Sequence, residues 1–143
     1  MRLTNFIYFL LFICAFGSCK KQTTKSTNTS SIKEITNVFI DKKEVKLDPL
    51  KGQWFYKEKA FNGFTIAYHK NESISEKTGF FNGKREGKIY KYFTNGSIKT
   101  EGSYLQNKLH GIKLNYFKNG NVYSESNYVN GKRHGVQKIW FLN

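Results

Sequence analysis

Hydrophobic and polar residues alternate along most of the chain beyond residue 52, in short segments separated by Asn and Gly. These segments are rich in Tyr, Phe, Ile and Val, and they lie at 88–94, 97–105, 112–118 and 121–129. Their length and composition are typical of β-strands. Because Pro49 is the single proline of the chain, no proline interrupts them. The pattern predicts an all-β protein.

The pattern recurs every 24 residues. Five columns of similar residues keep this spacing: a glycine, an aromatic residue, an asparagine, a β-branched residue and a second aromatic residue. Their members are Gly63, Gly87, Gly111 and Gly135; Tyr68, Tyr92, Tyr116 and Trp140; Asn71, Asn95, Asn119 and Asn143; Ile74, Ile98 and Val122; and Tyr56, Phe80, Tyr104 and Tyr128. Periods of about 20 to 50 residues are typical of solenoids, propellers and stacked arrays.

Two kinds of turn separate the strands. Asn95-Gly96 and Asn119-Gly120 are strong hairpin signals because both residue types tolerate positive φ, and Asn71-Glu72 fills the same position in the first copy. A second turn closes each unit, at residues 82–87, 107–111 and 130–135. Each repeat is therefore expected to hold two antiparallel strands, and the repeats should join into an elongated antiparallel meander sheet.

An even period returns every column to the same face of a sheet, because side chains alternate faces along a strand. Even positions are apolar and aromatic, whereas odd positions are mixed and basic. The predicted apolar face holds Phe64, Ile66, Tyr68, Ile74 and Phe80 in the first copy and Ile112, Leu114, Tyr116, Val122 and Tyr128 in the third. A three-residue loop with Gly96 in the left-handed conformation would place Tyr92 opposite Ile98. A two-residue loop would pair Phe93 with Ile98 and mix the faces, so the three-residue loop is preferred.

The motif Tyr-Phe-x-Asn-Gly-x-Val/Ile, followed by Tyr-x-Asn-Gly-Lys-Arg-His-Gly, resembles that of the MORN-repeat-variant family. These are bacterial hairpin-repeat proteins often described as antitoxins of toxin–antitoxin systems. The resemblance covers residues 52–143 and implies four repeats, the last one truncated. The first copy departs from the pattern, with His69 in place of Phe93 and Glu72 in place of Gly96. The resemblance implies an antitoxin-like or immunity-like role.

The start of the chain has the pattern of an export signal. Arg2 precedes an unbroken apolar run at residues 6–16. As a helix this run spans about 16 Å, roughly half the hydrocarbon core of a bilayer, which favours a cleaved signal over a membrane span.

The stretch Phe16-Gly17-Ser18-Cys19 resembles a bacterial lipobox, although that pattern usually has Leu at the place of Phe16. The resemblance implies a signal peptide at residues 1–18 and lipid attachment to Cys19. The alternative is an ordinary signal peptide with an unrelated cysteine. Residues 20–31 are polar and of low complexity, so residues 19–31 are expected to form a lipidated, flexible tether.

A lipid anchor would place the protein in the bacterial cell envelope. Lys20, rather than Asp, follows the cysteine, and by resemblance to enteric sorting this favours the outer membrane, facing the periplasm. Residues 32–51 are predicted to form an N-terminal strand and cap segment, with two short strands around Asp41-Lys42-Lys43.

The chain is strongly basic, with 24 Lys+Arg against 10 Asp+Glu. Because the protein is expected to be exported, nucleic acid is disfavoured as its partner. An anionic lipid headgroup, an anionic glycan or an acidic protein remains, and so does a simple contribution to solubility. Two basic pairs, Lys84-Arg85 and Lys132-Arg133, are predicted in the second turns. They are either solvated or in contact with an anionic partner.

Enzyme chemistry is not expected, and neither is a metal or a cofactor. Cys14 would leave with the signal and Cys19 would be blocked by lipid, so no free thiol would remain. Glu86, His110 and His134 occupy one column, but equivalent positions in neighbouring repeats lie about 9.5 Å apart. Zinc bonds to histidine measure about 2.0–2.1 Å, so these two histidines would not share one ion.

The aromatic column Tyr68, Tyr92, Tyr116 and Trp140 has two interpretations: cross-strand packing, or a platform that binds a partner. A single sheet must curl, be covered, dimerise or hold a partner to protect its apolar face. The sequence therefore predicts a non-enzymatic envelope lipoprotein that acts as a protein-interaction module. The alternative is a structural repeat protein that associates with anionic membrane lipid or envelope glycan. The oligomeric state stays open.

Overall fold

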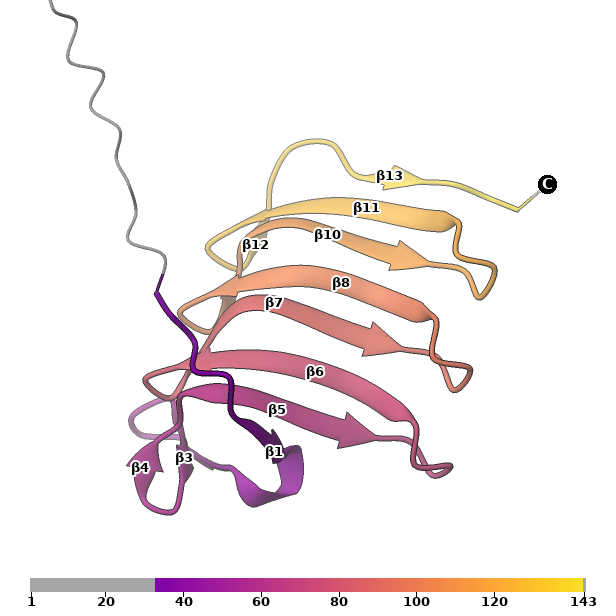
Figure 1. The fold of residues 1–143 in the computed structure, drawn as a ribbon. Coiled ribbons are helices and arrows are strands. Elements are labelled where there is room, and N and C mark those ends of the chain that lie inside the picture. Colours follow the sequence, from indigo (N-terminus) through magenta and orange to yellow (C-terminus); the bar gives the residue numbers. More distant parts are fainter. Residues whose placement is uncertain (1–32, 143) are drawn as a thin grey trace, which may run out of the picture. The chain divides into compact units, whose positions relative to one another are not determined.

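The computed structural model describes residues 33–142, so the predicted signal peptide, Cys19 and the polar tether lie outside the described residues. The fold is all-β, as predicted, and consists of a large sheet and a small one (Figure 1). Among residues 33–142 the single helix is the three-residue 3-10 turn η1, and no helix there is long and apolar enough to cross a membrane.

The large sheet has ten strands, which follow one another in hairpin order (Figure 1). Neighbouring strands are antiparallel except at one edge, where β1 runs parallel to β5. The strands are β1 (Phe39–Asp41), β5 (Gly63–Tyr68), β6 (Ile74–Phe81), β7 (Lys84–Tyr92), β8 (Ile98–Leu105), β9 (Lys108–Leu109), β10 (Gly111–Tyr116), β11 (Val122–Val129), β12 (Lys132–Arg133) and β13 (Lys138–Ile139).

The small sheet has three antiparallel strands, β2 (Lys46–Asp48), β3 (Gln53–Tyr56) and β4 (Lys59–Ala60). The turn η1 (Lys42–Glu44) links β1 to β2, and the carboxylate of Asp41 accepts a hydrogen bond from the backbone N–H of Lys43 at its start. The two short strands expected around Asp41-Lys42-Lys43 are thus present, but they belong to different sheets.

The hairpin loops have three residues, which confirms the preferred geometry. The N–H of Phe93 donates to the carbonyl of Ser97 (2.8 Å), and the N–H of Gly96 donates to the carbonyl of Phe93 (2.9 Å). Gly96 has a φ of +82°, in the left-handed region. Tyr92 therefore pairs with Ile98, as predicted. The same two backbone bonds recur 24 residues earlier, from His69, and 24 residues later, from Phe117.

A β-bulge follows each of these loops and reverses the alternation of the returning strand. In the β7–β8 pair, Tyr92 opposes Ile98 and Lys91 opposes Thr100, so Lys99 has no partner in the register. The same shift occurs in the β5–β6 and β10–β11 pairs. Side chains beyond the bulge therefore point to the face opposite the one that simple counting gives.

The prediction that all even positions share a face is wrong beyond the bulge. Phe80 pairs with Gly63, and Tyr128 pairs with Gly111. Because directly paired residues share a face, both aromatic side chains lie on the side of Thr65 and not on that of Tyr68. We call the two sides the tyrosine face, which holds Ile66, Tyr68, Ile74, Tyr92, Ile98, Tyr116 and Val122, and the threonine face, which holds Thr65, Thr78, Thr100, Phe80, Tyr104 and Tyr128.

The second turns are shorter than predicted. Asn82-Gly83 is a two-residue turn with φ of +46° and +73°, and it joins Phe81 directly to Lys84. Paired positive φ values are typical of the mirror-image hairpin turns that match strand twist. The basic pairs therefore lie in strands and not in turns, since Lys84-Arg85 opens β7 and Lys132-Arg133 forms β12.

The hydrophobic core lies at the first repeat, where the small sheet packs against the threonine face. Phe80 (3% exposed) and Phe61 (4% exposed) meet Ile40 and Val45 there, with Trp54 packed alongside. The rings of Phe61 and Phe80 are 5.7 Å apart. Residues 39–61 thus cover this face at one end of the sheet.

On the tyrosine face, Ile35 lies over Gly79 and Gly87, where an added Cβ would come within 2.9 and 3.3 Å of its Cδ1 atom. Glycine at position 79 allows this close approach. Beyond the first repeat, no second layer among residues 33–142 covers either face (Figure 1).

Candidate interaction surface

Three tyrosines form a row across the tyrosine face, each beside an aliphatic residue of the neighbouring strand. Tyr68 pairs with Ile74, Tyr92 with Ile98, and Tyr116 with Val122. Consecutive tyrosines are two strands apart, about 9.5 Å. The three-residue loops hold this row at one end of the strands, so the repeat presents the same apolar pair three times.

The row is most open to solvent at the first hairpin, whereas Tyr92, Tyr116 and Val122 are half-buried. Tyr68 is 52% exposed, Ile74 43% and Ile98 37%. Ile112, on the same face, is 57% exposed. Large apolar side chains that stay this exposed in series are typical of surfaces that contact a partner.

Tyr90, Glu101 and Leu114 form a second row beside the first, in the centre of the sheet. The rings of Tyr90 and Tyr92 stack with centroids 6.3 Å apart. Burial raises the pKa of Tyr92 above its usual value, and the nearby Tyr90 raises it further. The Tyr92 phenol is therefore neutral near pH 7.

Tyr116 interacts with Glu101. Burial raises the pKa of the Tyr116 phenol, and the charge of Glu101 and a hydrogen bond to it add to the effect. The Tyr116 phenol is therefore also neutral near pH 7. The five columns named above do not include Glu101 or Tyr90, although Tyr90 keeps the 24-residue spacing with Ile66 and Leu114 and lies two residues from Tyr92. Glu101 faces Tyr90 only because of the bulge, which the sequence pattern does not indicate.

Trp140 continues the column next to the third repeat. The backbone N–H of Trp140 donates to the backbone carbonyl of Tyr123 (2.9 Å), and the residue is 41% exposed. It lines a shallow hollow together with Val122 and Phe117. The fourth aromatic residue therefore lies beside the aliphatic partner of Tyr116.

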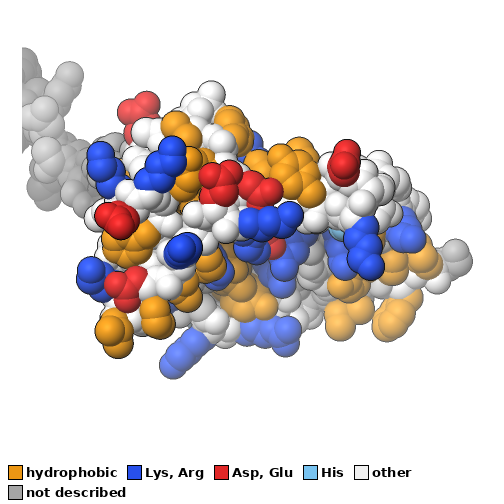
Figure 2. Space-filling view, turned by 90° about the horizontal axis from the view of Figure 1, so that it is seen from below, with side chains coloured by type: hydrophobic (Ala, Val, Ile, Leu, Met, Phe, Trp, Pro, Cys, Tyr) orange, Lys and Arg blue, Asp and Glu red, His pale blue; other side chains and the backbone are white. Residues whose placement is uncertain are grey.

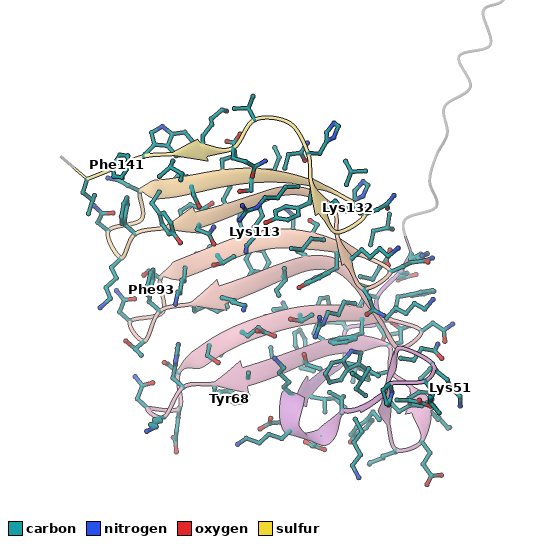
Figure 3. The ribbon with its side chains drawn as sticks, turned by 180° about the vertical axis from the view of Figure 1, so that it is seen from behind. Lys51, Tyr68, Phe93, Lys113, Lys132 and Phe141 are labelled. Atoms are coloured by element: carbon teal, nitrogen blue, oxygen red, sulfur yellow. The ribbon has the colours of Figure 1, made fainter. Side chains whose placement is uncertain are left out.

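The predicted basic residues lie elsewhere. Figure 3 shows Tyr68 and Phe93 toward one end of the strands and Lys132 toward the opposite end. The Arg85 guanidinium lies between the rings of Trp54 (5.3 Å) and Tyr104 (5.4 Å). Two further basic side chains are placed by β-pairing, Lys84 opposite Phe81 and Arg133 opposite Tyr128. The structure thus does not bring the basic pairs and the tyrosine row together.

Arg85 and Arg133 have structural contacts. Arg85 is sandwiched between two aromatic rings, a cation–π arrangement that links the small sheet to the second repeat. The Nε of Arg133 lies 3.4 Å from the Tyr128 hydroxyl oxygen, which can accept a hydrogen bond from it. Lys132 is exposed.

The residues of the titratable column, Glu86, His110 and His134, make hydrogen bonds in and beside the second turns. The backbone N–H groups of His110 and His134 donate to Ser103 and Asn127, each at 2.9 Å. The Glu86 carboxylate accepts from the N–H of Gln106 (2.9 Å). Within residues 33–142, no three His, Cys, Asp or Glu side chains are grouped so that they could hold a metal ion.

The underside of the molecule, seen in Figure 2, intermingles hydrophobic and basic side chains with scattered acidic ones. This view contains no continuous surface of one charge. Comparison of the chain with protein-family models, with curated proteins and with solved structures finds no match.

Proposed function

We propose that this protein is a non-enzymatic envelope lipoprotein whose sheet is a protein-interaction module, and that the tyrosine face contacts the partner. The observation that carries the proposal is the repeated row of tyrosine–aliphatic pairs, which is most exposed at its first pair, with Tyr68 52% and Ile74 43% exposed. Aromatic residues are enriched at protein interfaces and dominate their binding energy.

The row is well organised for binding. Each tyrosine is held in its strand by pairing with an aliphatic residue of the next strand, Tyr68 with Ile74, Tyr92 with Ile98 and Tyr116 with Val122. A side chain that is already ordered loses little conformational entropy when a partner docks. A rigid array of aromatic and aliphatic groups therefore favours a partner with a complementary apolar ridge.

The charges beside the row favour a protein over an anionic surface. The central register of this face runs through Lys77, Tyr90, Glu101, Leu114, Glu125 and Lys138. It holds two lysines and two glutamates, and Lys138 and Glu125 form an ion pair at 2.9 Å. A balanced set of charges gives an anionic bilayer or glycan no net attraction, whereas it suits the mixed rim of a protein interface.

The antitoxin-like or immunity-like role rests on the resemblance of residues 52–143 to the MORN-repeat variants. A lipid at Cys19 would hold the protein in the envelope, so the partner it neutralises would be a protein that reaches the envelope. The second candidate, association with anionic lipid or envelope glycan through the basic residues, is an outcome of the same test.

The test places a photo-crosslinking amino acid at Tyr68, Tyr92 or Tyr116 of the full chain in its native host. Ser126, on the threonine face, is the matched control position. We expect one protein adduct of defined mass from the tyrosine positions and none from Ser126, and we expect it to survive moderate salt. Ile98→Ser, placed in the same chain as the crosslinker at Tyr68, should reduce the yield.

Adducts that form equally from Ser126, or that contain only lipid or glycan, would contradict a protein-binding tyrosine face. If the lipid-free protein binds acidic vesicles and moderate salt releases it, the lipid-associated alternative is supported.

A further inference from the structure

The threonine face has a hollow in the second and third repeats, centred on Gly102. Gly102 lies between Ile89 of β7 and Lys113 of β10, in a register where all three positions point to this face. Because Gly102 has no side chain, it leaves a space of about 80 Å³. Its lining is partly apolar and partly polar or basic: Ile89, Leu109, Tyr104, Thr100, Lys91 and Lys113. Figure 3 shows Lys113 over the middle of the sheet.

The two lysines make the hollow positive. Lys113 makes no ion pair with a carboxylate of residues 33–142, and its Cβ and Cγ pack 3.6–3.7 Å from the position of a Cβ on Gly102. Among side chains that the strand registers place on this face, Glu76 is the one acid, and it faces both Lys42 (2.9 Å) and Lys91 (3.8 Å). The face thus has more cations than its carboxylate can pair.

The polar wall of the hollow is ordered. The Thr100 hydroxyl donates to the Asn115 side-chain oxygen (2.9 Å), and the Asn115 amide donates to the Ser124 hydroxyl oxygen (2.8 Å). A space of this size is far below the several hundred Å³ of a site for a cofactor or drug-sized ligand, so it admits one small group.

From these observations, we infer that the Gly102 hollow binds a single phosphate group, with Lys113 and Lys91 as its ligands. A phosphate monoester carries about −1.5 to −2 charges at neutral pH, which two ammonium groups balance. Lysine binds phosphate as a compact point charge, without the planar fork by which arginine selects carboxylates. The site lies on the face opposite the tyrosine row and is independent of the proposed protein contact.

Isothermal titration calorimetry of the full chain in detergent tests the inference, with inorganic phosphate as the probe and chloride holding the ionic strength constant. We expect saturable binding that Lys113→Gln weakens about tenfold, since a charge-assisted hydrogen bond is lost. Gly102→Val should abolish binding by filling the hollow. Lys88→Gln removes the same charge from an exposed position in the register of the other face, so it should leave binding unchanged.

Absence of saturable phosphate binding by the folded protein would overturn the inference, and so would equal affinities of Lys113→Gln and Lys88→Gln. The phosphate group could belong to a lipid headgroup or to a soluble compound, and binding to phosphatidylglycerol vesicles distinguishes these two sources. Vesicle binding that requires Lys113 supports a lipid headgroup as the source. Binding of inorganic phosphate without vesicle binding supports a soluble phosphate compound.

Discussion

Glu76 is a charged residue held inside the threonine face by three neighbours. Its Oε1 accepts hydrogen bonds from the Lys42 ammonium (2.9 Å) and the Thr78 hydroxyl (3.1 Å), and its Oε2 lies 3.8 Å from Lys91. Burial raises the pKa of Glu76, but the hydrogen bond and charge of Lys42, the hydrogen bond of Thr78 and the charge of Lys91 outweigh it. The net pKa therefore lies below the ordinary value of 4.5.

Glu76→Gln should lower the free energy of unfolding at pH 7 by about 1 kcal/mol, because both lysines are partly exposed and solvent screens the loss. A carboxylate with a depressed folded pKa stabilises the protein above its unfolded pKa, and this contribution disappears as pH falls through the folded pKa. Urea unfolding at pH 7 and below pH 4 checks this. The gap between wild type and variant should close in acid, and a constant gap would contradict the assignment.

At the scale of the hairpin, sequence patterns predicted the loops well and the faces only in part. The Asn-Gly pairs predicted the hairpin turns. The requirement that the two strands of a hairpin agree in face favoured three-residue loops with Tyr92 opposite Ile98, and the register confirms this pairing. The position of Phe80 was wrong because the bulge depends on pairing between strands, which a periodic count does not contain. The two-residue turn at Asn82-Gly83 likewise moved Lys84-Arg85 into a strand.

The candidate site was likewise predicted only in part. The columns predicted that Tyr68, Tyr92 and Tyr116 share a face, and the register confirms it because all three lie before the bulge. The contacts of Arg85 with Trp54 and Tyr104 could not be predicted, since they depend on how the small sheet packs against the large one.

Asn107 joins the two sheets through its side chain. Its Oδ1 accepts from the N–H of Arg85 and its Nδ2 donates to the carbonyl of Gly52, both at 2.8 Å. Asn107→Ala should lower the free energy of unfolding by about 2 kcal/mol, since two hydrogen bonds are lost. Asn107→Asp keeps the acceptor for the Arg85 N–H but turns a carboxylate oxygen, which cannot donate, toward the Gly52 carbonyl, so thermal or chemical denaturation should show that this variant is also destabilised. An alanine variant as stable as wild type would contradict this link.

At the scale of the whole chain, the two faces of the sheet are used differently. The small sheet covers the threonine face at the first repeat and forms the core around Phe61 and Phe80. The tyrosine row is exposed at Tyr68, Ile74 and Ile98 and half-buried at Tyr92, Tyr116 and Val122. The predicted lipid at Cys19 would bring this surface to a membrane. The core cluster around Phe61 and Phe80 thus lies on the threonine face, and the proposed partner contact lies on the tyrosine face, where Ile66 is buried.

Cys19→Ala should abolish lipid attachment, because the cysteine thiol is the acceptor in the lipobox chemistry that the sequence resembles. Metabolic labelling with a radioactive or clickable fatty acid should mark the wild type and leave the variant unmarked and uncleaved. Cys14→Ala is the matched control and should label like the wild type. Fatty-acid label that persists in Cys19→Ala would contradict lipid attachment at Cys19.

The division between the two faces is tested most directly by equilibrium unfolding of two aromatic variants. Phe80→Ala removes a ring that is 3% exposed and should cost about 3–5 kcal/mol, whereas Tyr68→Ser alters a ring that is 52% exposed and should cost less than about 1 kcal/mol. Urea unfolding of both proteins gives the comparison. A Tyr68→Ser variant as destabilised as Phe80→Ala would show that the tyrosine row belongs to the core, and it would contradict the proposal that this row is free to hold a partner.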